Sequence, residues 1–346
     1  MRDVHRTYDR ILVLKLRYIG DVLLSTPVLT RLRESFPKAH LTVLVNAGTE
    51  GVLRGHPAID EVLLVERGNW AGDVRLVREL RRRRFDLAVD LTDGDRSAIL
   101  ARLSGAPVRV GYNSEKRWRG RLYTETVQAD PFAMHAVPYH LQATEALGLS
   151  GPPPAPTLAL APEAKEAAAR LLKHAGIDTV HPLVCVHPGA RWWFKSWPPE
   201  RFAALADRIQ RETSAQAVFL GGRGERDIVD RIAMVMRSPH RSLVGHTNLQ
   251  ELAAVLEKAA LMVSNDNGAM HMAAALHVPV IGLFGPSDPV VWGPWGEGHR
   301  TFYKNVDCRA CFHPDCFRGE ENCMRQISVD EVWDAVKERL HSCVPR

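Results

Sequence analysis

Short apolar runs alternate with amphipathic segments along the first half of the chain. The apolar runs predict buried strands over residues 11–16, 41–45, 62–65, 87–89 and 108–110. Between them, apolar residues recur at helical spacing over residues 22–36, 73–83 and 96–104. This alternation predicts an α/β fold, in which helices cover both faces of a parallel sheet.

A proline-rich segment interrupts this pattern. Residues 151–156 contain four prolines, which fit neither a helix nor a central strand, so we predict two domains, residues 1–155 and 156–346. The alternation then restarts, and strands are predicted over residues 183–186, 217–220, 261–264 and 278–283. Helices are predicted over residues 199–211, 225–236, 249–259, 269–276 and 329–340. Ser328 and Glu331 form a capping box for the last helix.

Two doubly wound domains place ligands in a cleft beyond the carboxyl ends of their strands. Candidate functional residues are therefore those that directly follow a strand. Gly20 and Asp21 follow the first strand, where glycine permits a tight turn. From its position alone, Asp21 is interpreted first as a helix cap and second as a general base.

Three segments of the second half also follow strands. Residues 187–198 contain Arg191, Lys195 and three tryptophans, a combination that suits a diphosphate better than a surface loop with cation–π stacking. Residues 221–225 contain adjacent glycines before Glu225, which can accept hydrogen bonds from a ribose. Residues 264–271 lead into a helix and suit an anion, with Asp266 as a candidate cap of that helix.

Composition narrows the protein class. Apolar residues make up 45% and charged residues 25%, which excludes disordered, collagen-like and coiled-coil proteins. No secretory signal or membrane span is predicted, because charged residues interrupt the first apolar run and the longest uncharged stretch contains histidines and prolines. A P-loop, a nucleophile elbow and an H-E-x-x-H motif are all missing.

The net charge of +5 comes from the first predicted domain. Residues 1–155 hold 23 Lys and Arg against 18 Asp and Glu, whereas residues 156–346 hold 22 of each. Six basic residues from Arg102 to Arg121 share one acidic neighbour, Glu115. This cluster indicates an anionic partner, with a solvated surface as the alternative. The run Arg81–Arg84 is interpreted as offsetting a helix dipole rather than binding nucleic acid.

Four of the six cysteines are close together, at Cys308, Cys311, Cys316 and Cys323. Reduced thiols are expected, because no secretory signal is predicted. A structural metal with His313 nearby is one interpretation, but the paired C-x2-C knuckles of a zinc ribbon are missing. A packed, cysteine-rich loop is favoured, and the sequence leaves open whether it binds a metal.

Taken together, four stretches resemble glycosyltransferase family nine, the ADP-heptose:lipopolysaccharide heptosyltransferases. They are residues 15–27, 187–198, 264–276 and 282–289, and the cysteine cluster with Met324 is similar to the tail of many members. The resemblance covers residues 10–340 and looks closest to the heptosyltransferase III type. It implies the GT-B fold, with an acceptor-binding first domain and a nucleotide-sugar-binding second domain. The last helix of such a protein can pack back on the first domain.

The resemblance also implies roles for individual residues. Asp21 matches the general base, and Lys195 matches the lysine on the donor diphosphate. Glu225 matches the acid near the donor ribose, and Asp266 the acid at the transferred heptose. The other expected donor-binding residues are Arg191, Thr247, Asn267, Gly268 and His271. The expected acceptor-binding residues are Arg117, Arg119 and Arg121.

The implied reaction is inverting transfer of heptose from ADP-heptose to the lipopolysaccharide inner core, without a metal or other cofactor. The implied location is the cytoplasmic face of the inner membrane, with peripheral membrane contact and no nucleic-acid partner. Ala190 and Arg191 stand where the best-known members have hydroxyl residues, and Asn267 where they have threonine. Another nucleotide sugar therefore stays open as the donor, as do the acceptor hydroxyl and the oligomeric state. A nucleotide-sugar epimerase is the alternative enzyme, and a nucleotide-binding regulatory protein is the non-enzymatic one.

Overall fold

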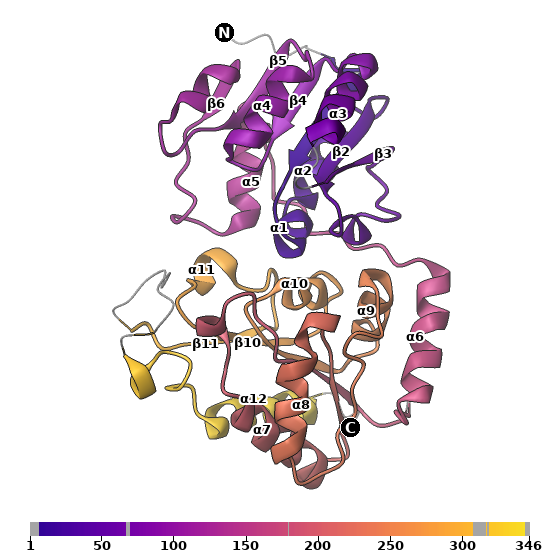
Figure 1. Ribbon diagram of the computed structural model, residues 1–346, viewed down its shortest axis with the longest axis vertical. Coiled ribbons are helices and arrows are strands. Elements are labelled where there is room, and N and C mark those ends of the chain that lie inside the picture. The colour runs from indigo at the N-terminus through magenta and orange to yellow at the C-terminus, as the bar shows by residue number, and fades with distance from the viewer. Residues whose placement is uncertain (1–6, 67–69, 179, 307–315, 317, 343–346) are drawn as a thin grey trace. The chain divides into compact units, whose positions relative to one another are not determined.

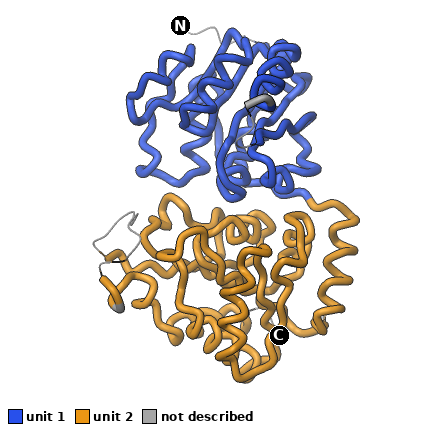
Figure 2. The backbone as a smooth tube through the Cα atoms, viewed as in Figure 1, with its two compact units in different colours: residues 1–159 blue, residues 160–346 orange. Residues whose placement is uncertain are grey.

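The computed structural model describes residues 7–66, 70–178, 180–306, 316 and 318–342 (Figure 1). The chain divides into two compact units, residues 1–159 and 160–346, here called unit 1 and unit 2 (Figure 2). The division predicted after residue 155 lies four residues before this boundary. Among the described helices, none has both the length and the apolar character needed to cross a membrane.

Unit 1 is built on a parallel sheet, which has the strand order β3-β2-β1-β4-β5-β6 within the described residues. Its strands are β1 Arg10–Lys15, β2 His40–Asn46, β3 Glu61–Val65, β4 Leu87–Asp90, β5 Val108–Tyr112 and β6 Glu125–Val127. The central strand β1 is buried from Ile11 to Lys15, as expected for a strand covered on both faces.

The helices of unit 1 differ from the prediction in two places. They are α1 Ile19–Leu24, α2 Thr26–Ser35, α3 Trp70–Arg83, α4 Asp95–Leu103 and α5 Ala136–Glu145, with short 3₁₀ helices η1 Glu50–Val52 and η2 Trp118–Leu122. The single helix predicted over residues 22–36 is two helices, because Pro27 begins α2 and has no N–H for a continuous helix. Helix α5 was not predicted: Pro138 lies in its first turn, and buried residues on most of its sides hide the helical period.

Unit 2 repeats the architecture, with the parallel order β11-β10-β9-β7-β8 in its described residues. Its strands are β7 Leu183–His187, β8 Gln216–Phe219, β9 Leu261–Asn265, β10 Val280–Phe284 and β11 Arg300–Tyr303. Its helices are α6 Pro162–His174, α7 Pro199–Glu212, α8 Arg226–Val235, α9 Leu249–Leu256, α10 Gly268–Ala275, α11 Pro289–Trp292 and α12 Val329–Ser342. Short 3₁₀ helices are η3 Trp193–Lys195, η4 Arg223–Glu225 and η5 Gly319–Glu321.

The last helix, α12, begins as predicted. The Ser328 N–H donates to Glu331 Oε2 at 2.9 Å, and the Glu331 N–H donates to Ser328 Oγ at 3.2 Å, which confirms the capping box. The helix packs within unit 2 against α7, β9 and β10. Arg208 of α7 lies over the buried ring of Trp333, with its guanidinium carbon 4.9 Å from the ring centroid.

Candidate functional site

Asp21 lies in the first turn of α1 and does not cap the helix. The N-cap residue is Tyr18, whose side chain makes no capping hydrogen bond. Gly20 is a buried residue inside the helix rather than part of a tight turn. The Asp21 side chain is 20% exposed, and its Oδ1 lies 3.8 Å from Nζ of Lys15. The cap interpretation is therefore wrong, and a partly exposed carboxylate next to a cation is compatible with a general base.

Lys195 and Asp266 come together in unit 2. Lys195 Nζ lies 2.6 Å from Asp266 Oδ2, although 71 positions separate the two residues. Lys195 ends η3 after β7, and Asp266 directly follows β9, so both lie beyond the carboxyl ends of adjacent strands. The lysine side chain is 24% exposed and the aspartate side chain 9%. A partly exposed ammonium at this edge can bind a phosphate group, and the carboxylate can accept hydrogen bonds from hydroxyls.

The residue that caps α10 is Asn267 and not its neighbour Asp266, which was the predicted cap. Asn267 is the N-cap of α10, where its Oδ1 accepts a hydrogen bond from the Met270 N–H at 3.1 Å. Its Nδ2 donates to the Gly189 carbonyl at 2.8 Å and lies 3.1 Å from Nδ1 of His187. The side chain expected to bind the donor therefore joins the loop after β7 to the loop after β9.

Glu225 is held against the loop after β7. Its carboxylate accepts a hydrogen bond from the Gly222 N–H at 2.6 Å, and its Oε2 lies 3.7 Å from Nε2 of His187. A Cβ atom on Gly189 would lie 1.5 Å from Glu225 Oε1, so only glycine leaves room for this arrangement. Burial lowers the pKa of His187, which favours a neutral ring. Nδ1 of this ring lies 3.1 Å from Nδ2 of Asn267, and Nε2 faces Glu225.

His187 and Gly189 are site residues that the sequence analysis did not assign. The sequence signal was their position directly at the end of β7, within the 187–198 segment already singled out. Their roles depend on side chains from η4 and α10, which are distant in the sequence.

The tryptophans of the 187–198 segment have different environments. Trp192 and Trp193 are 44% and 52% exposed, whereas Trp197 is fully buried and donates from Nε1 to the Ile327 carbonyl at 2.9 Å. Two of the three tryptophans are therefore accessible, and Trp197 belongs to the core of unit 2. The exposed Arg191 lies over Trp192, with its guanidinium carbon 5.2 Å from the ring centroid.

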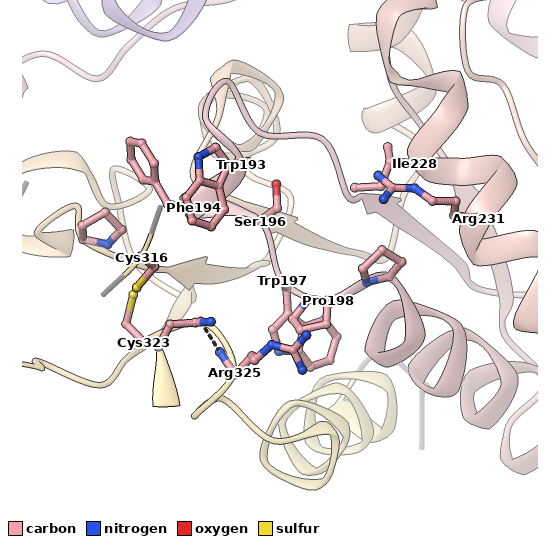
Figure 3. A pocket seen from close by; sticks show the side chains of 13 residues that line it. Trp193, Phe194, Ser196, Trp197, Pro198, Ile228, Arg231, Cys316, Cys323 and Arg325 are labelled. Atoms are coloured by element: carbon pink, nitrogen blue, oxygen red, sulfur yellow. Dashed lines mark hydrogen bonds between the residues drawn. The ribbon is translucent and has the colours of Figure 1, made fainter. Parts of the chain in front are cut away.

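A cavity of about 280 Å³ lies beside this segment (Figure 3). Trp193, Phe194 and Trp197 line it together with Ile228 and Arg231 of α8. Cys316 and Cys323 also line it, and Figure 3 shows their side chains pointing toward one another.

The predicted cysteine cluster is only partly described. Cys308, Cys311 and His313 lie outside the described residues, whereas Cys316 and Cys323 lie within them. In the part of the chain that the structure describes, no three or more His, Cys, Asp or Glu side chains form a group that could hold a metal ion.

The remaining expected donor residues lie within or just before two helices of unit 2. Thr247 is half-buried and precedes Asn248, the N-cap of α9. Gly268 is the first residue of α10, and His271 lies buried inside the same helix. Gly268 and His271 thus lie in the helix that Asn267 caps, whereas Thr247 lies just before a different helix, α9.

The basic cluster of unit 1 is more neutralised than predicted. Arg119 is only 2% exposed and forms ion pairs with Asp93 at 2.7 Å, Glu115 at 3.1 Å and Asp95 at 3.2 Å. The fold brings Asp93 and Asp95, at the start of α4, next to η2, so Glu115 is not the one acidic neighbour. Arg119 is therefore a buried ion-pair partner rather than part of an exposed patch.

Two of the expected acceptor arginines remain accessible. Arg117 is 51% exposed and pairs with Asp95 and Glu115 at 3.3 and 3.4 Å, and Arg121 is exposed. Trp118 between them is also half exposed, at 51%.

Comparisons with known proteins agree over most of the chain. The model of glycosyltransferase family 9 (heptosyltransferase) matches residues 74–320. Lipopolysaccharide heptosyltransferase 3 of Escherichia coli is 30% identical over 301 residues, which cover 83% of this chain and 87% of that protein.

Solved structures show the same fold. A glycosyltransferase family 9 structure from Veillonella parvula superposes with a TM-score of 0.86 at 25% identity, covering 97% of this chain and 98% of that one. The structure of E. coli ADP-heptose lps heptosyltransferase II gives a TM-score of 0.81 at 23% identity, covering 96% and 99%. The GT-B fold of two Rossmann-like units is therefore confirmed.

Proposed function

Because this chain belongs to glycosyltransferase family 9, the heptosyltransferases, we propose that it transfers heptose from ADP-heptose to the inner core of lipopolysaccharide. The chain is a glycosyltransferase. The observation that carries the proposal most directly is the convergence of Lys195, Asp266 and Glu225 at one edge of the unit 2 sheet. These are the residues that the family resemblance assigns to the diphosphate, the sugar and the ribose of the donor.

In the proposed reaction, unit 2 binds the donor. The positive charges of Lys195 and Arg191 stabilise the negative charge that grows on ADP as it leaves. Glu225 accepts hydrogen bonds from the ribose hydroxyls, and Asp266 accepts them from the heptose. The Lys195–Asp266 ion pair supports this assignment, because it keeps a cation and an acceptor adjacent where a diphosphate joins a sugar.

Unit 1 supplies the general base and binds the acceptor in this proposal. Asp21 removes the proton from the attacking hydroxyl of the acceptor as that oxygen bonds to the anomeric carbon. The bond from this carbon to the ADP oxygen breaks on the opposite side, so the configuration inverts through an oxocarbenium-like transition state. The step uses no metal or other cofactor.

The proposed location is the cytoplasmic face of the inner membrane. The acceptor is anchored in lipid, so a peripheral enzyme has to work at the membrane surface. The positive excess of the first half of the chain supports an anionic acceptor, since exposed charges attract opposite charges across about a Debye length. A nucleic acid is not a partner in this proposal.

Mass spectrometry of lipopolysaccharide tests the proposal in a strain that lacks this gene. The core is expected to lose one heptose together with any sugars attached to it. The wild-type gene should restore the heptose, and a gene encoding Asp21→Asn should not. A core that is unchanged by the deletion would contradict the proposal.

A further inference from the structure

Lys15 is a buried cation that the proposed reaction leaves without a role. It is the last residue of β1, and only 4% of it is exposed. Its Nζ donates to the Leu91 carbonyl at 2.8 Å and lies 2.8 Å from Nε2 of His140. An ammonium group has three N–H donors, so one points to neither of these partners, and Oδ1 of Asp21 lies 3.8 Å from Nζ, within ion-pair distance but beyond hydrogen-bond distance. Burying a charged lysine side chain costs free energy unless other groups compensate for it, so the position of Lys15 needs a physical explanation.

His140 accepts a hydrogen bond from this ammonium rather than repelling it. The ring is buried in α5, and its Nδ1 lies 3.1 Å from the Leu24 carbonyl. A carbonyl only accepts, so Nδ1 carries the ring proton and Nε2 presents a lone pair to Lys15. Burial, together with the charge of Lys15, keeps the pKa of His140 well below its ordinary value, which favours the neutral ring. Because Leu24 ends α1, His140 links Lys15 to the helix that carries Asp21.

Among the described charged groups around Lys15, the ion-pair partner is Asp21. Asp90 at the end of β4 is fully buried, and its carboxylate accepts hydrogen bonds from the Tyr123 hydroxyl and the Thr92 N–H, each at 2.8 Å. Burial raises the pKa of Asp90, which disfavours its charged form. Besides burial, the charge of Arg17 lowers the pKa of Lys15, and the charge of Asp93 raises it. Asp21 lies within ion-pair distance of Nζ.

We propose that Lys15 is the positioning residue of the general base: its ammonium, fixed by His140 and the Leu91 carbonyl, holds Oδ1 of Asp21 so that the other carboxylate oxygen can take the acceptor proton. This inference rests on the proposed role of Asp21. It gives a function to the buried Lys15–His140 pair, because this pair connects β1 and α5 to the helix that carries Asp21.

The first test replaces Lys15 with methionine, which has a similar length but no charge. The Lys15→Met protein is expected to lose about 10- to 100-fold in kcat, since a misplaced catalytic group can cost about that much. The donor KM should stay within about twofold, because the proposed donor residues lie in unit 2. Lys38→Met is the matched control on the exposed surface of the same unit, and it should keep wild-type kinetics. A thermal melt of each protein reports its folding.

The second test is a pH profile, which a purely structural role would not change. Burial lowers the pKa of Lys15 to about 8, opposed by the charge of Asp21. The wild-type kcat is therefore expected to fall as pH rises through about 8, because the ammonium loses its proton. Lys15→Met should lack this decline, and its profile should be flat over the same range. Equal kcat values, or profiles of the same shape, for Lys15→Met and the wild type would overturn the inference.

A double variant separates this inference from the proposed function. In an Asp21→Asn background, Lys15→Met should cause little further loss of kcat, because the lysine acts through the carboxylate. If Asp21→Asn is inactive but Lys15→Met is fully active, the inference fails and the proposed base stands. If Asp21→Asn is active, the proposed base itself fails. Should Lys15→Met not fold, His140→Leu takes its place. Loss of the hydrogen bond to the ammonium should then lower kcat and move the basic decline to lower pH. An unchanged kcat and decline in that variant would overturn the inference.

Discussion

At the scale of single residues, one candidate carboxylate in each unit has a lysine partner, but the two pairs differ. Asp266 touches Lys195 at 2.6 Å and is nearly buried, whereas Asp21 is 3.8 Å from Lys15 and is the more exposed of the two. In the first pair the lysine is accessible, and in the second it is buried. These differences suit a donor-binding cation in unit 2 and a reacting carboxylate in unit 1.

Replacing the proposed base should remove turnover without removing the fold. Asp21→Asn keeps the size of the side chain, but its amide cannot take a proton at neutral pH. We expect kcat to fall by about 10² to 10⁴, the usual contribution of a general acid or base. Binding of ADP, measured by calorimetry, should be unchanged. A variant that keeps more than about a tenth of the wild-type rate would exclude Asp21 as the base.

The second residue prediction concerns the diphosphate. Lys195→Ala removes a charge-assisted hydrogen bond, worth about 1.5–3 kcal/mol, so the Kd for ADP should rise by about 10- to 150-fold. Lys165→Ala is a matched control, because Lys165 forms an ion pair of similar length, 2.7 Å, with Glu257 elsewhere on unit 2. Calorimetry with ADP should detect the loss only for Lys195. Equal affinities for ADP in both variants would place Lys195 outside the diphosphate site.

At the scale of elements, three loops of unit 2 depend on one another. Residues after β7, β8 and β9 meet through His187, Glu225 and Asn267, and the absent side chain of Gly189 makes room for the Glu225 carboxylate. The proposed ribose-binding acid therefore depends on the backbone of a neighbouring loop.

A methyl group at Gly189 tests this dependence. Gly189→Ala should displace the Glu225 carboxylate, since the new Cβ would lie 1.5 Å from Oε1. Affinity for ADP should fall to about that of Glu225→Ala, and the two changes together should cost little more than either alone. Gly224→Ala in η4 is the control, because a Cβ there would meet no neighbouring atom within 4 Å and the backbone needs no positive φ. A Gly189→Ala protein that binds ADP normally would show that Glu225 does not contribute.

The sequence predicted most elements of both sheets, because buried parallel strands are continuous apolar runs that end where polar loops begin. It missed the short edge strands β6 and β11, whose residues are largely half-buried or exposed and carry no such run. Candidate residues directly after strands, such as Asp21 and Lys195, could be found from their position and the family resemblance. Their partners could not, because contacts such as Lys15 with His140 join residues 125 positions apart.

At the scale of the whole molecule, the excess positive charge belongs to unit 1, but the fold neutralises part of it. The acidic start of α4 approaches η2, so Arg119 is buried among three acids. Charge counted along the sequence therefore overstates the exposed positive surface. Of the three arginines expected to bind an anionic acceptor, Arg117 and Arg121 remain exposed.

The salt dependence of the acceptor KM tests whether Arg117 and Arg121 attract the acceptor. Replacing Arg117 and Arg121 together with serine should raise the acceptor KM and flatten its dependence on salt, because exposed charges attract an anion only within about 8–10 Å at moderate ionic strength. The donor KM should stay nearly constant. Arg119→Ser is expected instead to lower the melting temperature, since it leaves Asp93 without its buried partner. Parallel salt curves for the wild type and the double variant would remove the patch from the acceptor site.

The central claim is heptose transfer, and a direct assay combines the purified enzyme, ADP-heptose and lipopolysaccharide from the strain that lacks the gene. Mass spectrometry should show the acceptor gaining one heptose, with one ADP released for each transfer, including in the presence of EDTA. Without acceptor, the nucleotide sugar should stay unchanged apart from slow hydrolysis. Conversion of the nucleotide sugar to an isomer without acceptor would instead indicate an epimerase. An acceptor of unchanged mass, under conditions in which the enzyme binds ADP, would contradict the account.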